Sequence, residues 1–270
     1  MVGWPVAHSR SPAIQNAALT AVGLTGWRYQ LLPAPPELLA ELLAALPGAG
    51  FRGVNVTIPH KEAALALATD PTERARAIGA ANTLWFEAEA GSSVRIGADN
   101  TDAPALLRSL PIAIAGATAL VLGAGGSARA AVWALLQAGA AEVRVLNRSP
   151  QRARELCDRL GGIVVDQAQP ADLLVNCTAV GLGSEAAFAQ LPLGPQDLTS
   201  YGCVVDFVYA AAGTELVRAA RERGVAAVDG LELLVGQGAL SFERFTGRAA
   251  PLEAMRRAVG RGDSDYRGAR

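Results

Sequence analysis

The chain contains 270 residues, with 24 basic and 25 acidic side chains and a net charge of −1. Because 51% of the residues are hydrophobic and only 18% are charged, the composition excludes a disordered polymer and predicts one large globular domain or two smaller ones. The balanced charge gives no reason to expect nucleic acid or an anionic membrane as a partner.

The first half of the chain mixes helical and strand-like periodicity. Helical patterns cover residues 12–22, 37–46 and 61–68, and strand patterns lie near 28–32 and 52–58. In the last of these, Val54 and Val56 alternate with Asn55 and Thr57, so the two polar residues share one face. Thr57 is therefore expected to point away from the valines.

The second half alternates short apolar strands with helices. Strand patterns cover 119–122, 143–146, 163–165, 173–175, 204–208 and 225–228, and helical patterns cover 128–137, 150–160 and 215–223. This alternation predicts a parallel sheet with helices on both faces. Two further helical patterns, at 232–245 and 252–259, follow Gly230.

No targeting or metal-binding signal stands out. The first 20 residues lack a basic stretch followed by an apolar core, which predicts a cytoplasmic protein. The charge-free stretch 109–128 is interrupted by Pro111 and several glycines, so a strand and turn are expected there instead of a membrane span. Cys157, Cys177 and Cys203 are widely spaced, which predicts buried, reduced thiols and no metal site.

A glycine-rich turn follows the strand pattern at 119–122. Its residues are Gly123, Ala124, Gly125, Gly126, Ser127 and Ala128, a G-x-G-x-x-A sequence that opens a helix. Glycine allows the tight turn and the close approach of a pyrophosphate, and the amide groups of the helix start bind phosphates. The sequence alone is also compatible with an ordinary turn, but its place between a strand and a helix favours a dinucleotide site.

The next strand pattern ends before Asn147, Arg148 and Ser149. A fold that prefers NAD usually has an acid here for the ribose 2′-hydroxyl, and this chain has none. Arg148 and Arg152 offer guanidinium groups suited to a 2′-phosphate. The alternative is that these arginines form a solvated helix face, and we accept it for Arg154 and Arg159. We expect Arg148 and Arg152 to contact the 2′-phosphate, which predicts NADP as the cofactor.

Lys61 ends the sequence N-V-T-I-P-H-K that begins at Asn55. It is the only lysine, so arginine occupies the other 23 basic positions (24 − 1). Arginine holds its proton too tightly to act as a general acid or base, whereas lysine can be tuned to do so. The alternative is a surface lysine at the start of a helix. The use of lysine at this one basic position favours a role in proton transfer.

Asp102 and two serines are further polar candidates. Asp102 ends the sequence N-T-D before a helical pattern at 104–110, so it can either cap that helix or pair with the Lys61 ammonium. Ser9 and Ser11 follow His8 near the start of the chain, and Ser11 can alternatively cap the helix that begins at Pro12.

Nine ordered motifs together resemble the shikimate dehydrogenase family. They are G-x-P-x-x-H-S-x-S-P at 3–12, N-V-T-x-P-x-K at 55–61, G-A-x-N-T at 79–83, N-T-D at 100–102, G-A-G-G-x-x-R at 123–129, N-R-S-x-x-R at 147–152, N-x-T at 176–178, D-x-V-Y at 206–209 and G-x-x-x-L-x-x-Q-G at 230–238. The resemblance implies an NADP-dependent enzyme that reduces 3-dehydroshikimate to shikimate in aromatic amino-acid biosynthesis.

The resemblance also implies roles for individual residues. Lys61 would be the general acid and base and Asp102 its partner. The substrate would be held by Ser9, Ser11, Thr57, Asn82, Asp102, Tyr209 and Gln237. The cofactor would be held by Gly123, Ala124, Gly125, Gly126, Ser127, Asn147, Arg148, Ser149 and Arg152, with Thr178, Phe207, Gly230 and Glu73 toward its nicotinamide end.

Three positions depart from the family pattern. Gln15 stands where a histidine is usual, and we interpret it as a packing residue. Ala211 replaces a common proline, which predicts a looser loop. Only Met1 and Val2 precede Gly3, so either the recorded start is late or the substrate domain lacks most of an edge strand.

These observations predict a two-domain α/β enzyme. Residues 1–101 plus 231–270 would form the substrate-binding domain, and 102–230 a Rossmann-like, doubly wound NADP domain, with the C-terminal helices returning to the first domain. We expect a monomer or homodimer that acts on a small molecule, without nucleic-acid or membrane partners.

Three alternatives are compatible with parts of the pattern. A quinate dehydrogenase would share the pocket, although the Arg148 region disfavours NAD. A silent nucleotide-binding module would need neither Lys61 nor Asp102. Methylenetetrahydrofolate dehydrogenase shares the architecture, but the paired serines suit a small carboxylate better than a folate.

Overall fold

The computed structural model describes residues 1–87, 94–183 and 186–261. The described chain divides into two compact units, one made of residues 1–101 and 237–261, the other of residues 102–236. The boundary predicted from the sequence follows residue 230, where helix α9 (Gly230–Thr246) begins. Because this helix belongs to both units, no loop marks the change from one to the other.

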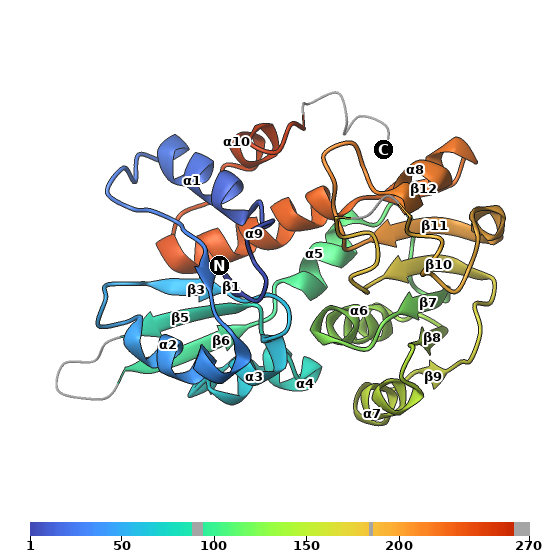
Figure 1. The fold of residues 1–270 in the computed structure, drawn as a ribbon, viewed down its shortest axis with the longest axis horizontal. Helices are drawn as coiled ribbons and strands as arrows, with labels where there is room; N and C mark the ends of the chain where they lie inside the picture. Colours follow the sequence, from blue (N-terminus) through green and yellow to red (C-terminus); the bar gives the residue numbers. More distant parts are fainter. Residues whose placement is uncertain (88–93, 184–185, 262–270) are drawn as a thin grey trace. The chain divides into compact units, whose positions relative to one another are not determined.

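The second unit contains a six-stranded parallel sheet (Figure 1). Its strands are β7 (Thr118–Leu122), β8 (Glu142–Leu146), β9 (Ile163–Val164), β10 (Ala171–Asn176), β11 (Tyr201–Asp206) and β12 (Ala226–Val228). The strands lie side by side in the order β9-β8-β7-β10-β11-β12. This is the 3-2-1-4-5-6 order of dinucleotide-binding folds, in which the order of the strands along the sheet reverses between β7 and β10. This confirms the predicted α/β, Rossmann-like class.

Helices cover both faces of this sheet, because its strands are apolar on both sides. They are α5 (Asp102–Ser109), α6 (Gly126–Gln137), α7 (Pro150–Leu160), the 3₁₀ helix η2 (Pro195–Ser200) and α8 (Glu215–Glu222). In β7, Val121 packs in the cluster that includes α6 and α7, whereas Leu120 and Leu122 pack with α8 and η2. Alternate residues of one strand therefore contribute to two separate hydrophobic cores.

The first unit has a mixed four-stranded sheet in the order β3-β5-β6-β4, and a separate pair β1-β2. The strands are β1 (Val2–Gly3), β2 (Leu32–Pro33), β3 (Gly53–Asn55), β4 (Asp70–Pro71), β5 (Thr83–Glu87) and β6 (Arg95–Asp99). A bridge between Val2 and Val56 links the pair to the chain after β3.

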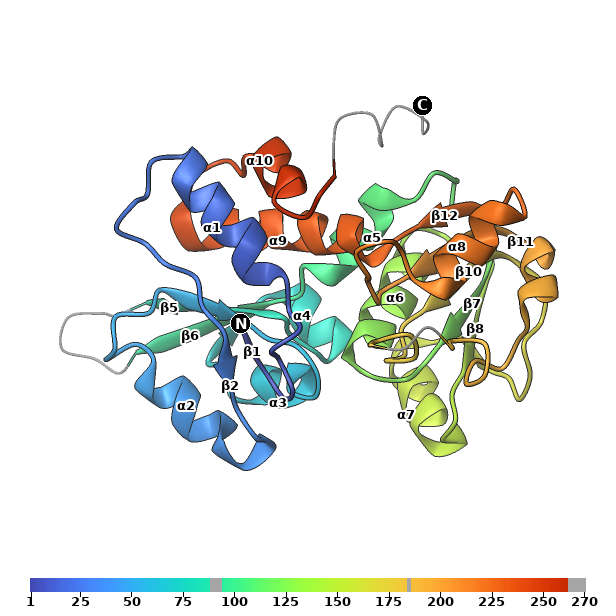
Figure 2. The same cartoon turned by 45° about the horizontal axis from the view of Figure 1, so that its top comes forward.

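Two groups of helices enclose this sheet (Figure 2). The helices are α1 (Ser11–Ala21), η1 (Pro36–Leu38), α2 (Leu39–Ala45), α3 (Lys61–Ala66), α4 (Glu73–Ile78), α9 and α10 (Leu252–Arg257). Val54 and Leu84 pack with α2 and α3 in an apolar core. Asn55 and Thr83, which are register partners, face α9, where Ser241 hydrogen-bonds to both.

Candidate active site

The chain after β3 places Thr57 against the N-terminal strand. The Thr57 amide donates to the Val2 carbonyl at 2.9 Å, and the Trp4 amide donates to the Ile58 carbonyl at 3.0 Å. A Cβ on Gly3 would lie 2.5 Å from the Thr57 methyl carbon. Glycine at position 3 therefore makes room for the Thr57 side chain.

Ser11 has a buried hydroxyl group in the first turn of α1. Ser11 is 1% exposed, and its oxygen has no hydrogen-bond partner among the described residues. It does not cap α1, whose N-cap is Arg10, so the capping alternative is wrong. Ser9 lies beside it, accepting a hydrogen bond from the Ser11 amide at 3.3 Å. A buried hydroxyl without a partner costs about 1–3 kcal/mol, a cost that a ligand oxygen would remove.

Lys61 is the first residue of α3 and is half-buried. Its carbonyl accepts a hydrogen bond from the Ala81 amide at 2.8 Å, and the Val56 amide donates to the Asn82 carbonyl at 2.8 Å. These two bonds bring the segment around Asn82 beside the chain between β3 and α3. The Asn82 side-chain nitrogen lies 3.4 Å from the Gln237 side-chain oxygen. The first unit therefore joins Asn82 and Gln237, which are far apart in sequence.

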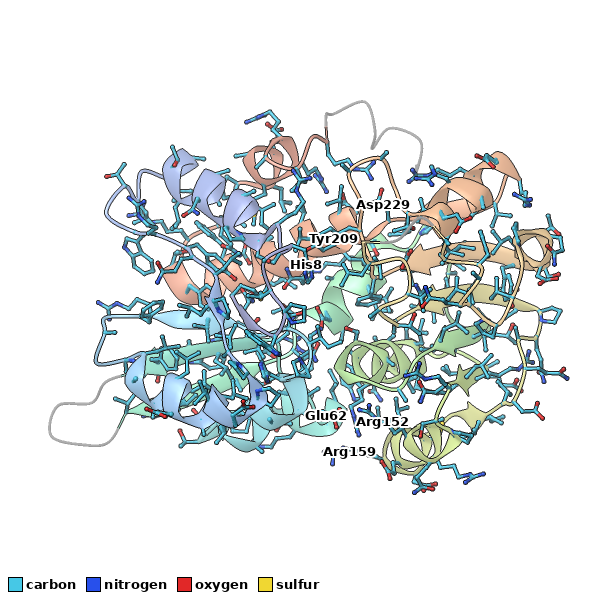
Figure 3. The ribbon with its side chains drawn as sticks, viewed as in Figure 1. His8, Glu62, Arg152, Arg159, Tyr209 and Asp229 are labelled. Carbon is cyan, nitrogen blue, oxygen red and sulfur yellow. The ribbon has the colours of Figure 1, made fainter. Side chains whose placement is uncertain are left out.

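The two histidines differ in environment. His60 is 2% exposed, and its Nε2 lies 2.7 Å from the Ala34 carbonyl, which makes it a structural link. His8 is exposed and is labelled in Figure 3. Gln15 is buried and donates to the Gly238 carbonyl at 2.9 Å, so its amide ties α1 to α9.

Asp102 and Tyr209 belong to the second unit. Asp102 is the first residue of α5 and is 7% exposed. Tyr209 is half-buried in the loop after β11, and Asp229 precedes α9 (Figure 3). The pairing of Asp102 with Lys61 stays a prediction.

The glycine-rich turn connects β7 to α6 at the carboxyl edge of the parallel sheet. Gly123 has φ +109°, and a Cβ there would lie 3.2 Å from the Cys177 backbone, so a side chain would be strained and crowded. At Gly125, the N-cap of α6, a Cβ would meet nothing within 4 Å. The open space in front of a helix N-terminus fits a pyrophosphate.

The Asn147–Ser149 segment follows β8 at the same edge. Arg148 is exposed, and its guanidinium has no ion-pair partner within the described part of the chain. Ser149 is the N-cap of α7, yet its side chain makes no capping bond. Arg152 and Arg159 both come from α7 (Figure 3). A cation and a hydroxyl group at this point fit a 2′-phosphate.

The loops after β10 and β11 carry Thr178 and Phe207. The Thr178 hydroxyl donates to Asn176 Oδ1 at 2.7 Å, and the Phe207 amide donates to the Asn176 carbonyl at 2.9 Å. A Cβ on Gly230 would lie 2.5 Å from the Val208 carbonyl oxygen. Only glycine therefore lets the start of α9 reach this loop.

A buried carboxylate that the sequence analysis did not single out anchors the same loop. Asp206 is 1% exposed and accepts hydrogen bonds from Thr214 at 2.6 Å, Asn176 at 2.9 Å and the Val208 amide at 3.0 Å. Burial raises the pKa of Asp206 to about 6, although the three donors act in the opposite direction. Its place in the D-x-V-Y motif was the only signal in the sequence.

Glu73 belongs to the first unit, unlike the other predicted cofactor residues. It is the exposed first residue of α4, in the first unit, whereas the glycine-rich turn and Arg148 belong to the second. Its role stays a prediction.

The cysteines are free thiols, but they are not uniformly buried. Cys203 is buried, whereas Cys157 and Cys177 are only half-buried, which corrects the expectation from sequence. Burial raises the pKa of Cys203 to about 11. In the described ranges, no helix is long and apolar enough to cross a membrane.

Comparisons with known proteins agree along the chain. Family models match residues 1–84 (Shikimate dehydrogenase substrate binding domain), 106–180 (Shikimate / quinate 5-dehydrogenase) and 230–259 (Shikimate 5'-dehydrogenase C-terminal domain). A shikimate dehydrogenase (NADP(+)) of Nitrobacter hamburgensis is 42% identical, covering 96% of this chain and 92% of that protein.

Solved structures are similar over the same length. A shikimate 5-dehydrogenase of Thermus thermophilus, in complex with NADP(H) and shikimate, is 40% identical with a TM-score of 0.83, covering 96% of this chain and 97% of that chain. A 5-ketofructose reductase of a Gluconobacter strain is 28% identical with a TM-score of 0.81, covering 96% of both chains.

Proposed function

Because this chain belongs to the shikimate dehydrogenase family of NADP-dependent oxidoreductases, we propose that it interconverts shikimate and 3-dehydroshikimate with NADP as cofactor. The observation that carries the proposal is the 40% identity, over 96% of the chain, to an enzyme whose structure contains NADP(H) and shikimate. The product of this reaction would serve aromatic amino-acid biosynthesis.

The first unit would bind the substrate through its polar side chains. Ser9, Ser11 and Thr57 would hold the carboxylate, because hydroxyl groups can donate to its oxygens. The buried hydroxyl of Ser11, which has no partner in the described chain, supports this assignment. Ring hydroxyl groups would be held by Asn82 and Gln237, joined by Tyr209 and Asp102 from the second unit.

The second unit would bind NADP at the carboxyl edge of its parallel sheet. The turn at 123–127 would hold the pyrophosphate, as the open space at Gly125 supports. Arg148, with Asn147, Ser149 and Arg152, would hold the 2′-phosphate, and Thr178, Phe207 and Gly230 would border the nicotinamide, with Glu73 nearby. When bound, NADP supplies the hydride acceptor or donor.

Lys61 would move the proton in this reaction. In oxidation, its neutral amine takes the proton of the substrate hydroxyl that becomes the carbonyl, and in reduction its ammonium returns that proton. Asp102 would pair with the ammonium and keep it oriented. The absence of every other lysine from the sequence supports a role that arginine does not fill.

Quinate is the second candidate substrate. One matching family model is described as Shikimate / quinate 5-dehydrogenase, and quinate presents a carboxylate and ring hydroxyl groups to the same residues. The lack of an acid after β8 makes NAD the less suitable cofactor for either substrate.

Measuring the absorbance of the reduced nicotinamide tests the proposal directly. The purified chain is assayed with shikimate and quinate, each with NADP+ and NAD+. We expect the highest kcat/KM for shikimate with NADP+. Higher kcat/KM for quinate would replace the substrate assignment, and no turnover of either compound would overturn the proposed function.

A further inference from the structure

A continuous path of hydrogen bonds runs through the first unit on the side of the sheet that faces α9. The Tyr29 hydroxyl lies 2.8 Å from Asn55 Oδ1. Asn55 Nδ2 donates to the Ser241 hydroxyl at 2.7 Å and to the Thr83 hydroxyl at 3.1 Å. Asn55 is 2% exposed, and Thr83 and Ser241 are 0% exposed. Such a network is shielded from water, so each missing partner is costly.

The path ends on the two residues proposed to hold ring hydroxyl groups. The side-chain oxygen of Asn82 accepts from the Thr83 hydroxyl at 3.0 Å and from the Thr101 amide at 2.8 Å. Its side-chain nitrogen is turned toward Gln237 Oε1, 3.4 Å away. The Ser241 hydroxyl donates to the Gln237 carbonyl at 2.9 Å. These contacts fix which end of the Asn82 amide is a donor.

The chemistry of the groups sets one direction of donation along the path. A carboxamide or backbone oxygen can only accept, so the Thr83 proton goes to Asn82 and the Ser241 proton goes to Gln237. Both hydroxyl oxygens then accept from Asn55 Nδ2, which also donates to the Asn82 backbone carbonyl at 3.2 Å. Asn55 therefore presents its oxygen to Tyr29, and the Tyr29 hydroxyl is the donor that begins the path.

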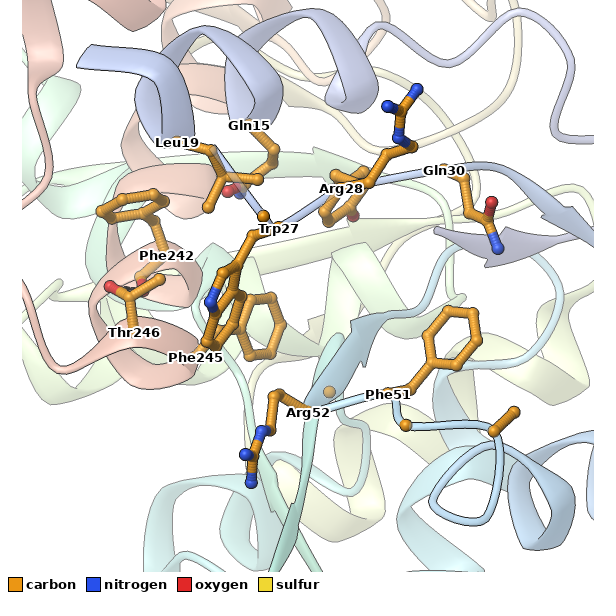
Figure 4. Close-up of a pocket in the computed structure, with 15 residues that line it drawn as sticks. Gln15, Leu19, Trp27, Arg28, Gln30, Phe51, Arg52, Phe242, Phe245 and Thr246 are labelled. Carbon is orange, nitrogen blue, oxygen red and sulfur yellow. Dashed lines mark hydrogen bonds between the residues drawn. The ribbon is translucent and has the colours of Figure 1, made fainter. Parts of the chain in front are cut away.

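Tyr29 is itself held in place by its backbone. Asn16, on α1, accepts from the Tyr29 amide and donates to its carbonyl, both at 2.9 Å. Tyr29 also lines a cavity of about 360 Å³ together with aromatic side chains that include Trp27, Phe51 and Phe245 (Figure 4). A phenylalanine at position 29 would keep the aromatic ring and remove only the hydroxyl group.

We propose that Tyr29 is a positioning residue for substrate binding, acting through Asn55 on Asn82 and Gln237; this inference rests on the proposed function. Without the phenol group, the buried Asn55 Oδ1 loses its Tyr29 donor, so the Asn55 side chain is held less firmly against its other partners. A shift of Asn55 loosens its contacts with the Ser241 and Thr83 hydroxyl groups and with the Asn82 carbonyl, and these contacts help to position Gln237 and Asn82.

Tyr29→Phe tests the start of the path. We expect the KM for shikimate to rise about tenfold, the usual scale of one buried hydrogen bond, while kcat and the KM for NADP+ change less than about twofold, since neither the proton-transfer group nor the nucleotide site is touched. Tyr201→Phe is the matched control, because Tyr201 is buried in the second unit. It should leave all three constants unchanged.

Ser241→Ala tests the middle of the path and keeps the proposal falsifiable if Tyr29→Phe does not fold. It should also raise the KM for shikimate. Thr246→Val is its control. The Thr246 hydroxyl donates to the Phe242 carbonyl at 2.8 Å, and the Ser241 hydroxyl likewise donates to the carbonyl four residues before it on the same helix. An unchanged KM for shikimate in the Tyr29 and Ser241 variants overturns the inference, even if their melting temperatures fall.

A readout without turnover separates this inference from the proposed function. The side-chain amide resonances of Asn82 are recorded by ¹⁵N NMR in the wild type and the four variants. Shifts confined to Tyr29→Phe and Ser241→Ala support the positioning role even if shikimate is not a substrate, in which case only the proposed function fails. Shifts in all four variants or in none contradict it.

Discussion

Replacing Gly230 by alanine places a Cβ against the loop that carries Phe207. That carbon would lie 2.5 Å from the Val208 carbonyl oxygen and 2.9 Å from the Phe207 carbonyl oxygen. An ordinary carbon–oxygen contact is about 3.4 Å, so the Val208 carbonyl would have to retreat by about 0.9 Å (3.4 − 2.5). Overpacking of this kind costs about 1–3 kcal/mol. We expect a fall of that size in the free energy of unfolding, and NADP+ binding weakened by about tenfold.

Gly236→Ala is the matched control, because it makes the same change on the same helix. Its Cβ would lie 3.3 Å from the Ala105 methyl carbon, a mild contact that the helix propensity of alanine, about 1 kcal/mol better than glycine, offsets. Urea denaturation gives the stability of each variant, and calorimetric titration gives the Kd of NADP+. If Gly230→Ala is as stable as Gly236→Ala and binds NADP+ as the wild type does, the close approach of α9 to this loop contributes neither to stability nor to cofactor binding.

Three further predictions concern other parts of the site. Arg148→Leu should weaken NADPH binding by about tenfold or more and leave NADH binding nearly unchanged, with Arg154→Leu as control; equal losses for both cofactors would refute the assignment. Ser11→Ala should raise the free energy of unfolding by about 1 kcal/mol, since it removes a buried hydroxyl without a partner, while raising the KM for shikimate; a loss of stability would contradict this explanation. The pKa of Asp206 is about 6 in the folded state, against 3.8 for the free group. Because the folded state holds this proton more tightly, the contribution of Asp206 to the free energy of unfolding falls by about 3 kcal/mol as the pH rises from about 4 to about 6. Urea denaturation from pH 4 to 7 should therefore show Asp206→Asn gaining on the wild type, and the opposite trend would mean that the three donors outweigh burial.

Local signals predicted the parts of the site that depend on one segment. The glycine-rich turn at 123–128 lies between β7 and α6 because glycine, strand and helix preferences agree within a few residues. Lys61 begins α3, as the helical pattern at 61–68 predicts, although β3 covers only Gly53–Asn55 of the strand pattern at 52–58. The strand expected near 28–32 is shorter, because only Leu32–Pro33 pairs with β1, and Tyr29 is held by Asn16 outside any strand.

Long-range contacts decide the rest of the site. Asn82 and Gln237 are 155 residues apart in the sequence, and Asn55 and Ser241 are 186 apart. The periodicity of these segments does not predict which hydroxyl group hydrogen-bonds to which amide. The same holds for Asp206, whose partners are Asn176 at the end of β10 and Thr214 at the N-cap of α8. Only the folded sheet brings these groups together.

The general acid and base assignment of Lys61 is tested most directly by two substitutions compared with the wild type. Lys61→Arg keeps the positive charge but removes a usable proton, and Lys61→Met removes both. With shikimate and NADP+, kcat should fall by about 10²–10⁴-fold in both variants, while calorimetry shows NADP+ affinity within about twofold of the wild type. If Lys61→Arg retains most of the wild-type kcat, Lys61 supplies charge and not a proton, and the proposed mechanism is wrong.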